Sequence, residues 1–145
     1  MYSNPAAEHF ELARQIEPSD IDINGHVNNV VYIRWVQEVA IAHWRAVASE
    51  VQQSSISWVV VRHEIDYKHA ARIGDAVIAC TWVGAASARF FERHTEILRA
   101  SDRRLLARAL TLWCPIDIKS GRPMRVAEDV RERFSVPSVD VPPES

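Results

Sequence analysis

Residues 30–48 form a predicted helix whose side chains are apolar on almost every side. A surface helix buries one face and exposes the other, so a helix of this composition must be covered on several sides by the rest of the chain. Its polar side chains lie in one narrow stripe: Arg34, Gln37, Glu38 and Arg45. Within the stripe, Arg34 and Glu38 are one turn apart and are expected to pair. The chain must therefore fold around this helix.

Strand-like segments lie on both sides of the helix in the sequence. One precedes it, at residues 9–16, where apolar and polar positions alternate apart from Arg14. The breaks between the later strands are short, as in antiparallel connections. Residues 50–55 are expected to be a loop and residues 127–134 a short helix. The later strands are expected at residues 57–67, 76–83, 88–98 and 105–115. The pattern predicts an α+β domain with the helix packed on an antiparallel sheet.

Length and composition indicate one domain with a substantial core. The chain has 145 residues, of which 48% are hydrophobic and 25% charged, so residues 1–135 are expected to form a single domain. The Pro-rich residues 136–145 are expected to be a disordered tail. Runs such as Trp58–Val61 are apolar on both faces, and their second face must meet something other than the helix, such as a second subunit.

The net charge of the chain does not indicate a polyanionic partner. A net charge of −2 excludes neither acidic nor basic ligands, but it does not favour nucleic acid or an anionic membrane surface. The N-terminal residues lack a signal-peptide pattern and no run reaches membrane-spanning length, so a cytoplasmic protein is expected. Cys80 and Cys114 lie in separate strand-like runs, which favours buried, reduced thiols.

Polar residues capable of chemistry are concentrated just before the helix. Asp22, Asn24, Gly25, His26 and Asn28 fall within seven positions. Asn28 or Asn29 can cap the helix, so the helix is expected to begin there. The first backbone N–H groups and the positive end of the helix dipole would then face Asp22 and His26, where they can polarise an acyl carbonyl. A tight structural loop is the alternative interpretation of each residue taken alone.

The stretch Asp22-Ile-Asn-Gly-His-Val-Asn-Asn-Val-Val-Tyr-Ile-Arg-Trp35 resembles the signature Asp-x-Asn-x-His-Val-Asn-Asn-x-x-Tyr-x-x-Trp of hotdog-fold thioesterases. It is most similar to plant acyl-ACP thioesterases, and the wider group includes acyl-CoA thioesterases of the 4-hydroxybenzoyl-CoA thioesterase type. The resemblance continues through residues 59–67 with Gly74-Asp75, and returns at residues 120–123. It implies the hotdog fold, a five-stranded antiparallel sheet wrapped around a long central helix.

The resemblance also implies roles for individual residues. It places the essential aspartate of the bacterial enzymes on Asp22, as nucleophile or general base, and their carbonyl-polarising amide on the backbone N–H of Asn29. It places the catalytic Asp, Asn and His of the plant enzymes on Asp22, Asn24 and His26. Asn28 and Asn29 would position the substrate, and Ser87 and Arg89 would help to hold the CoA. One plant feature is missing, because the position of a further catalytic glutamate holds Ala70.

Together these features predict a thioesterase that hydrolyses acyl-CoA without a further cofactor, as a homodimer or homotetramer, with acyl-ACP as the alternative substrate. A hydratase of the same fold is a rival, but its motif Asp-x-Asn-Pro-x-His has a proline that is absent here and a histidine one residue later. A non-catalytic acyl-binding protein is the other rival. No histidine pair has metal-ligand spacing on a helix face, no Gly-x-Ser-x-Gly elbow is present, and no metal is expected.

Overall fold

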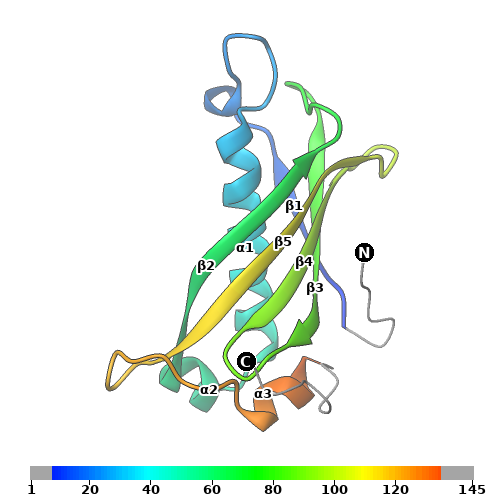
Figure 1. Ribbon diagram of the computed structural model, residues 1–145. Coiled ribbons are helices and arrows are strands. Elements are labelled where there is room, and N and C mark those ends of the chain that lie inside the picture. Colours follow the sequence, from blue (N-terminus) through cyan, green and yellow to red (C-terminus); the bar gives the residue numbers. More distant parts are fainter. Residues whose placement is uncertain (1–7, 135–145) are drawn as a thin grey trace.

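The computed structural model describes residues 8–134, and the expected C-terminal tail lies outside this range. One long helix, α1, runs along the inner face of a curved sheet, from the loop at residues 20–28 at one end to the short helices at the other (Figure 1). The strands are β1 (Phe10–Gln15), β2 (Ile56–Tyr67), β3 (Ala76–Ala86), β4 (Phe91–Arg99) and β5 (Leu105–Asp117). The helices are α1 (Asn29–Val47), α2 (Glu50–Ser55) and α3 (Glu128–Arg133), with a 3₁₀ turn at Pro18–Asp20.

All neighbouring strands of the sheet are antiparallel, in the order β1-β3-β4-β5-β2. The strand that follows α1 in the chain, β2, therefore lies at one edge, and the strand that precedes α1 lies at the other. This arrangement confirms the predicted five-stranded antiparallel sheet wrapped around a helix. None of the helices within residues 8–134 combines the length and apolar character needed to cross a membrane.

The start of α1 is set by an asparagine cap, as predicted. The side-chain oxygen of Asn28 accepts a hydrogen bond from the backbone N–H of Val30 at 3.2 Å, and its carbonyl accepts one from Val31 at 2.9 Å. These two bonds satisfy amides that have no partner inside the helix. The N-terminus of α1 is therefore fixed beside the polar loop.

One side of α1 is buried along its length, whereas Val30 and Ile41 on its other side are 64% and 42% exposed. Trp35 and Val39 are fully buried, and Tyr32 is buried with its hydroxyl accepting a hydrogen bond from the backbone N–H of Ala71 at 2.9 Å. The polar stripe is bridged to the sheet, because Glu38 accepts a bond from Arg14 of β1 at 2.9 Å and lies 3.6 Å from Arg34. This bridge explains why Arg14 interrupts the alternation of β1.

Two predicted connections differ in the structure. Residues 50–55 form α2 rather than a loop, because Ser49 and Gln52 make a reciprocal capping box with bonds of 3.0 and 2.9 Å. Gly84 does not end β3: the strand passes through a register shift between Val83 and Ala85 and continues to Ala86. Both differences arise from local pairings that apolar periodicity does not reveal.

His63 contacts the neighbouring strand. The residue lies within β2, where its Nδ1 is 2.9 Å from the hydroxyl of Thr111 on β5. A bulge between Val60 and Arg62 shifts the alternation of the strand and places His63 in this half-buried position. Burial lowers the pKa of its imidazole.

A buried polar chain joins α1 to the sheet near the other end of the helix. Arg93 of β4 donates from Nη1 to Nδ1 of His43 at 2.9 Å and to the hydroxyl of Thr81 at 3.2 Å. Because Nδ1 accepts, the ring proton of neutral His43 lies on Nε2, where it is donated to Glu8 at 3.2 Å. Burial, and then the charge of Arg93, lower the pKa of His43 to about 4.

This shift predicts a loss of stability in mild acid. Between the unfolded value of about 6.5 and the folded value of about 4, the unfolded chain binds the His43 proton and the folded chain does not, so the free energy of unfolding falls as the pH falls. The full effect is roughly 3 kcal/mol, and this group adds no further loss below the folded pKa. Urea unfolding across this range should show a shallower pH slope for His43→Gln. Identical slopes would contradict the assignment.

Candidate active site

The loop before α1 is closed by its own backbone. The N–H of Asp22 donates to the carbonyl of His26 at 2.8 Å, and the N–H of Gly25 donates to the carbonyl of Asp22 at 3.0 Å. Gly25 adopts a φ of +79°, a left-handed conformation that costs other residues strain. The N–H of Val27 donates to the carbonyl of Ala71 at 3.0 Å, which ties the loop to the segment between β2 and β3.

The carboxylate of Asp22 has one oxygen committed to this loop. Its Oδ1 accepts hydrogen bonds from the backbone N–H groups of Asn24 at 2.9 Å and His26 at 3.1 Å. Its Oδ2 has no hydrogen-bond partner within residues 8–134. The loop thus holds the carboxylate in place through one oxygen and leaves the other able to react or to accept a proton.

The first turn of α1 supplies a donor beside this carboxylate. The amides of Val30 and Val31 are bound by Asn28, whereas the backbone N–H of Asn29 has no hydrogen bond to another described residue. A first-turn amide carries the partial positive charge of the helix end, so it can stabilise an oxygen that becomes negative. The loop and the helix therefore offer complementary groups, a carboxylate oxygen and an amide donor.

A small pocket of about 180 Å³ brings these groups together. Asp22, His26 and Asn29 line it, which assembles three of the sequence-predicted site residues. Asn24 is exposed and Asn28 caps the helix, and neither lines the pocket. The remaining lining residues are Val27, Tyr32, Tyr67, Lys68, His69 and Ala70.

The predicted CoA-binding pair lies far from this pocket within one chain. Ser87 and Arg89 are in the turn between β3 and β4, beside α3 and at the opposite end of the sheet from the Asp22 loop (Figure 1). The Ser87 hydroxyl accepts bonds from the N–H groups of Arg89 and Phe90 at 3.2 and 3.1 Å, so it closes the turn. Any contact of this turn with a ligand at Asp22 would have to come from a second copy of the chain.

Sequence reasoning did not assign the end of β2 to the site. Tyr67, Lys68 and His69 line the pocket, and the Tyr67 hydroxyl donates to the carbonyl of Asn29 at 3.2 Å. The Asp66-Tyr67 pair within the motif resemblance was the available signal. Ala70, which occupies the plant glutamate position, also lines this pocket. The pocket thus has a methyl group where the plant motif supplies a carboxylate.

The arrangement can activate water or attack a carbonyl carbon. It combines a carboxylate with a free oxygen, an imidazole and an amide donor at a helix N-terminus. A long helix wrapped by an antiparallel sheet, with such a loop at the N-terminus of the helix, is the hotdog class of fold. The chain belongs to the thioesterase-like superfamily, whose family model matches residues 16–134.

Curated relatives agree with this membership. The chain is 26% identical over 94 residues to a chloroplastic palmitoyl-acyl carrier protein thioesterase from Cuphea hookeriana, an alignment that covers 65% of this chain and 23% of that protein. The chain spans about a quarter of the length of the curated relatives it matches.

Solved structures share the fold. A putative oleoyl thioesterase from Lactobacillus plantarum has a TM-score of 0.83 at 19% identity, covering 97% of this chain and 56% of the other. A 1,4-dihydroxy-2-naphthoyl-CoA thioesterase from Synechocystis has a TM-score of 0.74 at 21% identity, covering 88% of this chain and 96% of the other. The predicted hotdog fold is confirmed.

The loop geometry predicts different costs for two substitutions at Gly25. A Cβ at this position meets no neighbouring atom, so the only penalty is the positive φ. Gly25→Ala should lower the free energy of unfolding by about 1 kcal/mol, and Gly25→Asn by less, because asparagine adopts left-handed conformations more readily. Equilibrium urea unfolding measures both. Equal losses for the two variants would show that the backbone conformation of Gly25 is not the cause.

Proposed function

We propose that this protein hydrolyses an acyl-CoA thioester to a carboxylic acid and CoA at the Asp22 pocket. The observation that carries the proposal is that the two oxygens of the Asp22 carboxylate have different contacts. One oxygen is held by two loop amides, and the other is unengaged in a pocket that also presents the first-turn N–H of α1. A positioned base or nucleophile and an oxyanion donor are the two parts that thioester hydrolysis requires.

Two routes use the same groups. In the first, Asp22 takes a proton from water, the water oxygen bonds to the thioester carbon, and the C–S bond breaks to release the CoA thiolate, which is then protonated. In the second, Asp22 itself bonds to the carbonyl carbon, the thiolate leaves, and water hydrolyses the resulting anhydride. In both routes the Asn29 amide donates to the developing oxyanion. His26 is close enough to the pocket to be an alternative base for water.

A CoA carrier is favoured over an acyl carrier protein by the pocket itself. The plant acyl-ACP motif supplies a further glutamate where this chain has Ala70, so the plant mechanism cannot operate here unchanged. A small aryl- or acyl-CoA is also compatible with the naphthoyl-CoA enzyme that shares the fold. Acyl-ACP remains the second candidate substrate, and direct competition between the two carriers distinguishes them.

We also propose a homodimer formed through β2. Within residues 8–134 this strand pairs with β5 alone, which leaves its other edge without a neighbouring strand. Val59 and Val61 of the strand are 44% and 51% exposed. A two-fold axis that pairs two β2 strands antiparallel places the Tyr67 end of one copy beside the Ile56 end of the other. Such a dimer would bring the Ser87 turn of a second copy towards the Asp22 pocket.

Asp22→Asn tests the activity. Asparagine keeps an oxygen that can accept the two loop amides but cannot act as base or nucleophile, so turnover of acyl-CoA should fall by at least roughly 10²-fold with the fold intact. Thiol release from short, long and aromatic acyl-CoAs measures this loss. Asp129→Asn is the matched control, because it makes the same change from carboxylate to amide at an exposed residue of α3 that does not line the pocket.

Three outcomes would refute the assignment. Turnover by Asp22→Asn at the wild-type rate would exclude Asp22 as base or nucleophile. Hydration of enoyl-CoA without thiol release would identify a hydratase. Tight acyl-CoA binding with no turnover of either CoA or acyl carrier protein substrates would identify a binding protein.

The oligomeric state has its own test. Sedimentation at micromolar concentration should give a mass of twice the 16.5 kDa chain, or a multiple of it. Substitution of Val61 by Lys adds a charge to the exposed edge strand and should weaken the association. A wild-type species of 16.5 kDa would contradict the dimer.

A further inference from the structure

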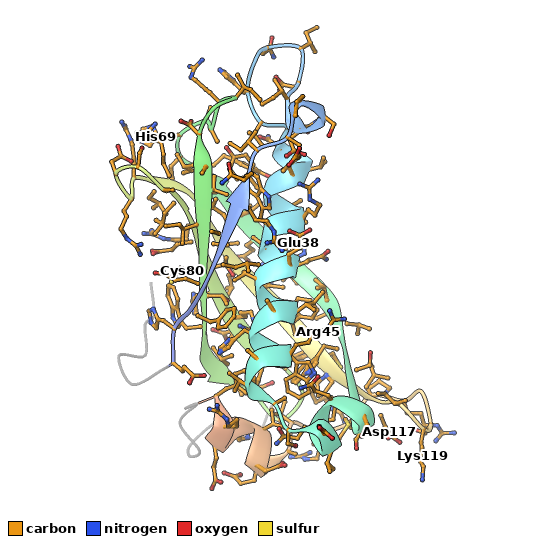
Figure 2. The ribbon with its side chains drawn as sticks, turned by 180° about the vertical axis from the view of Figure 1, so that it is seen from behind. Glu38, Arg45, His69, Cys80, Asp117 and Lys119 are labelled. Atoms are coloured by element: carbon orange, nitrogen blue, oxygen red, sulfur yellow. The ribbon has the colours of Figure 1, made fainter. Side chains whose placement is uncertain are left out.

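A second and larger pocket lies away from the Asp22 loop. It has a volume of about 480 Å³ and is bounded by the C-terminal half of α1, by α2 and by the first residues of β2. Figure 2 shows Arg45, which lines it, towards the opposite end of the molecule from His69 of the Asp22 pocket. The helix alone separates Asn29 from Trp44 by about 22 Å.

Four aromatic side chains form one part of the wall of this pocket. Trp44 meets Trp58 edge-to-face with ring centroids 5.4 Å apart, and Trp58 stacks on Phe91 at 4.8 Å. Trp113 is the fourth aromatic residue, and the rest of the lining is aliphatic, polar (Gln53 and Ser57) or cationic. Aromatic walls of this kind favour a flat or extended apolar ligand over a hydrated one.

The charged groups of the pocket are all positive. Arg93 and Arg45 line it, and no acidic side chain among the described residues does. Arg45 is exposed, whereas Arg93 is 3% exposed. The described residues contain no ion pair to Arg93, and its two hydrogen bonds go to the uncharged acceptors His43 and Thr81. Glu8, the nearest acid in this chain of contacts, is hydrogen-bonded to His43 and not to Arg93.

The free edge of the Arg93 guanidinium has the geometry that a carboxylate needs. Both of its hydrogen bonds use Nη1, so Nε and Nη2 have no hydrogen-bond partner within residues 8–134. The N–H groups of Nε and Nη2 lie side by side on one edge, where a carboxylate can accept both in parallel. Burial of this cation lowers its pKa to about 9. Within residues 8–134 the charge is offset by two hydrogen bonds and by the Phe134 ring, whose centroid is 5.9 Å from the guanidinium carbon, and a bound anion would add the opposite charge.

We propose that this pocket binds an organic acid with an aromatic or long apolar body, and that its carboxylate pairs with Arg93. Two sources share this chemistry: a free acid such as the product of thioester hydrolysis, and an acyl group whose distal end carries a second carboxylate. The choice between these two sources rests on the proposed thioesterase activity. The proposal that the pocket binds an organic acid does not depend on that activity.

Calorimetric titration with 1-naphthoate and its neutral analogue 1-naphthamide tests the binding site without any turnover. Wild-type protein should bind the anion at least roughly tenfold more tightly than the amide, since a paired charge contributes about that much or more. Arg93→Met should abolish the preference. Arg108→Met is the matched control, because it removes the same charge from a side chain that pairs with Glu96 across β4 and β5 and does not line the pocket, and it should keep the preference.

A second variant covers the case in which Arg93→Met does not fold. Ile41 lines the pocket and is 42% exposed on α1, so Ile41→Trp should fill the pocket without disturbing the core and should weaken naphthoate binding at least roughly tenfold. Equal affinity of wild type for naphthoate and naphthamide, absence of binding of either, or an undiminished preference in folded Arg93→Met would overturn the proposal.

Kinetics distinguish the two sources of the acid. The substrates are acyl-CoAs of equal chain length, long enough to span the distance between the two pockets, that end in a methyl group or in a carboxylate. If the pocket receives the acyl group, Arg93→Met should raise KM for the carboxylate-ended series alone, at least roughly tenfold. If it receives a free acid, KM of both series should be unchanged and naphthoate should inhibit wild type but not Arg93→Met. Naphthoate binding in a protein that hydrolyses neither series would refute the thioesterase activity and leave the binding site standing.

Discussion

Burial of α1 is the constraint on which the structure depends. A helix with Trp35, Val39 and His43 fully buried needs contacts along its whole length, and a flat sheet cannot supply them. Five antiparallel strands supply them by curving around it. Because the sheet covers one side of the helix along its length, the two pockets described here lie towards its ends. The Asp22 pocket occupies one end and the Arg93 pocket the other.

Sequence patterns predicted the parts of the fold that repeat and missed the parts that depend on single contacts. The all-round apolar character of residues 30–48 was sufficient for the wrapped helix, and Asn28 for its start. The α2 helix depends on one reciprocal pair of hydrogen bonds. The positions of His63 and Gly84 depend on register shifts in β2 and β3. The periodicity of apolar residues detects neither feature. In the site, Asp22, His26 and Asn29 were predictable because they are close in sequence. Tyr67 to Ala70 join them only through the fold.

The structural role of Asp22 in its loop leaves one carboxylate oxygen for the proposed chemistry. The loop needs an acceptor for the amides of Asn24 and His26, and the carboxylate provides it with one oxygen. The structural and functional interpretations of this residue, which the sequence left as alternatives, are therefore compatible. The same reasoning separates Asn28 from Asn29. The side chain of Asn28 caps the helix, whereas the backbone N–H of Asn29 has no hydrogen bond to another described residue.

The exposed face of β2 carries a pattern of charge that bears on the proposed dimer. Arg62, Glu64 and Asp66 alternate along the exposed face of the strand, with Arg62 and Glu64 already in contact. A second copy aligned in the same direction would place like charges opposite one another, whereas a reversed copy can place Arg62 opposite an acid. In the proposed dimer, a reversed pair of β2 strands would therefore place opposite charges side by side. Such a pair joins the β2 edges of the two copies and leaves the β1 strand of each copy at the far edge of its own sheet.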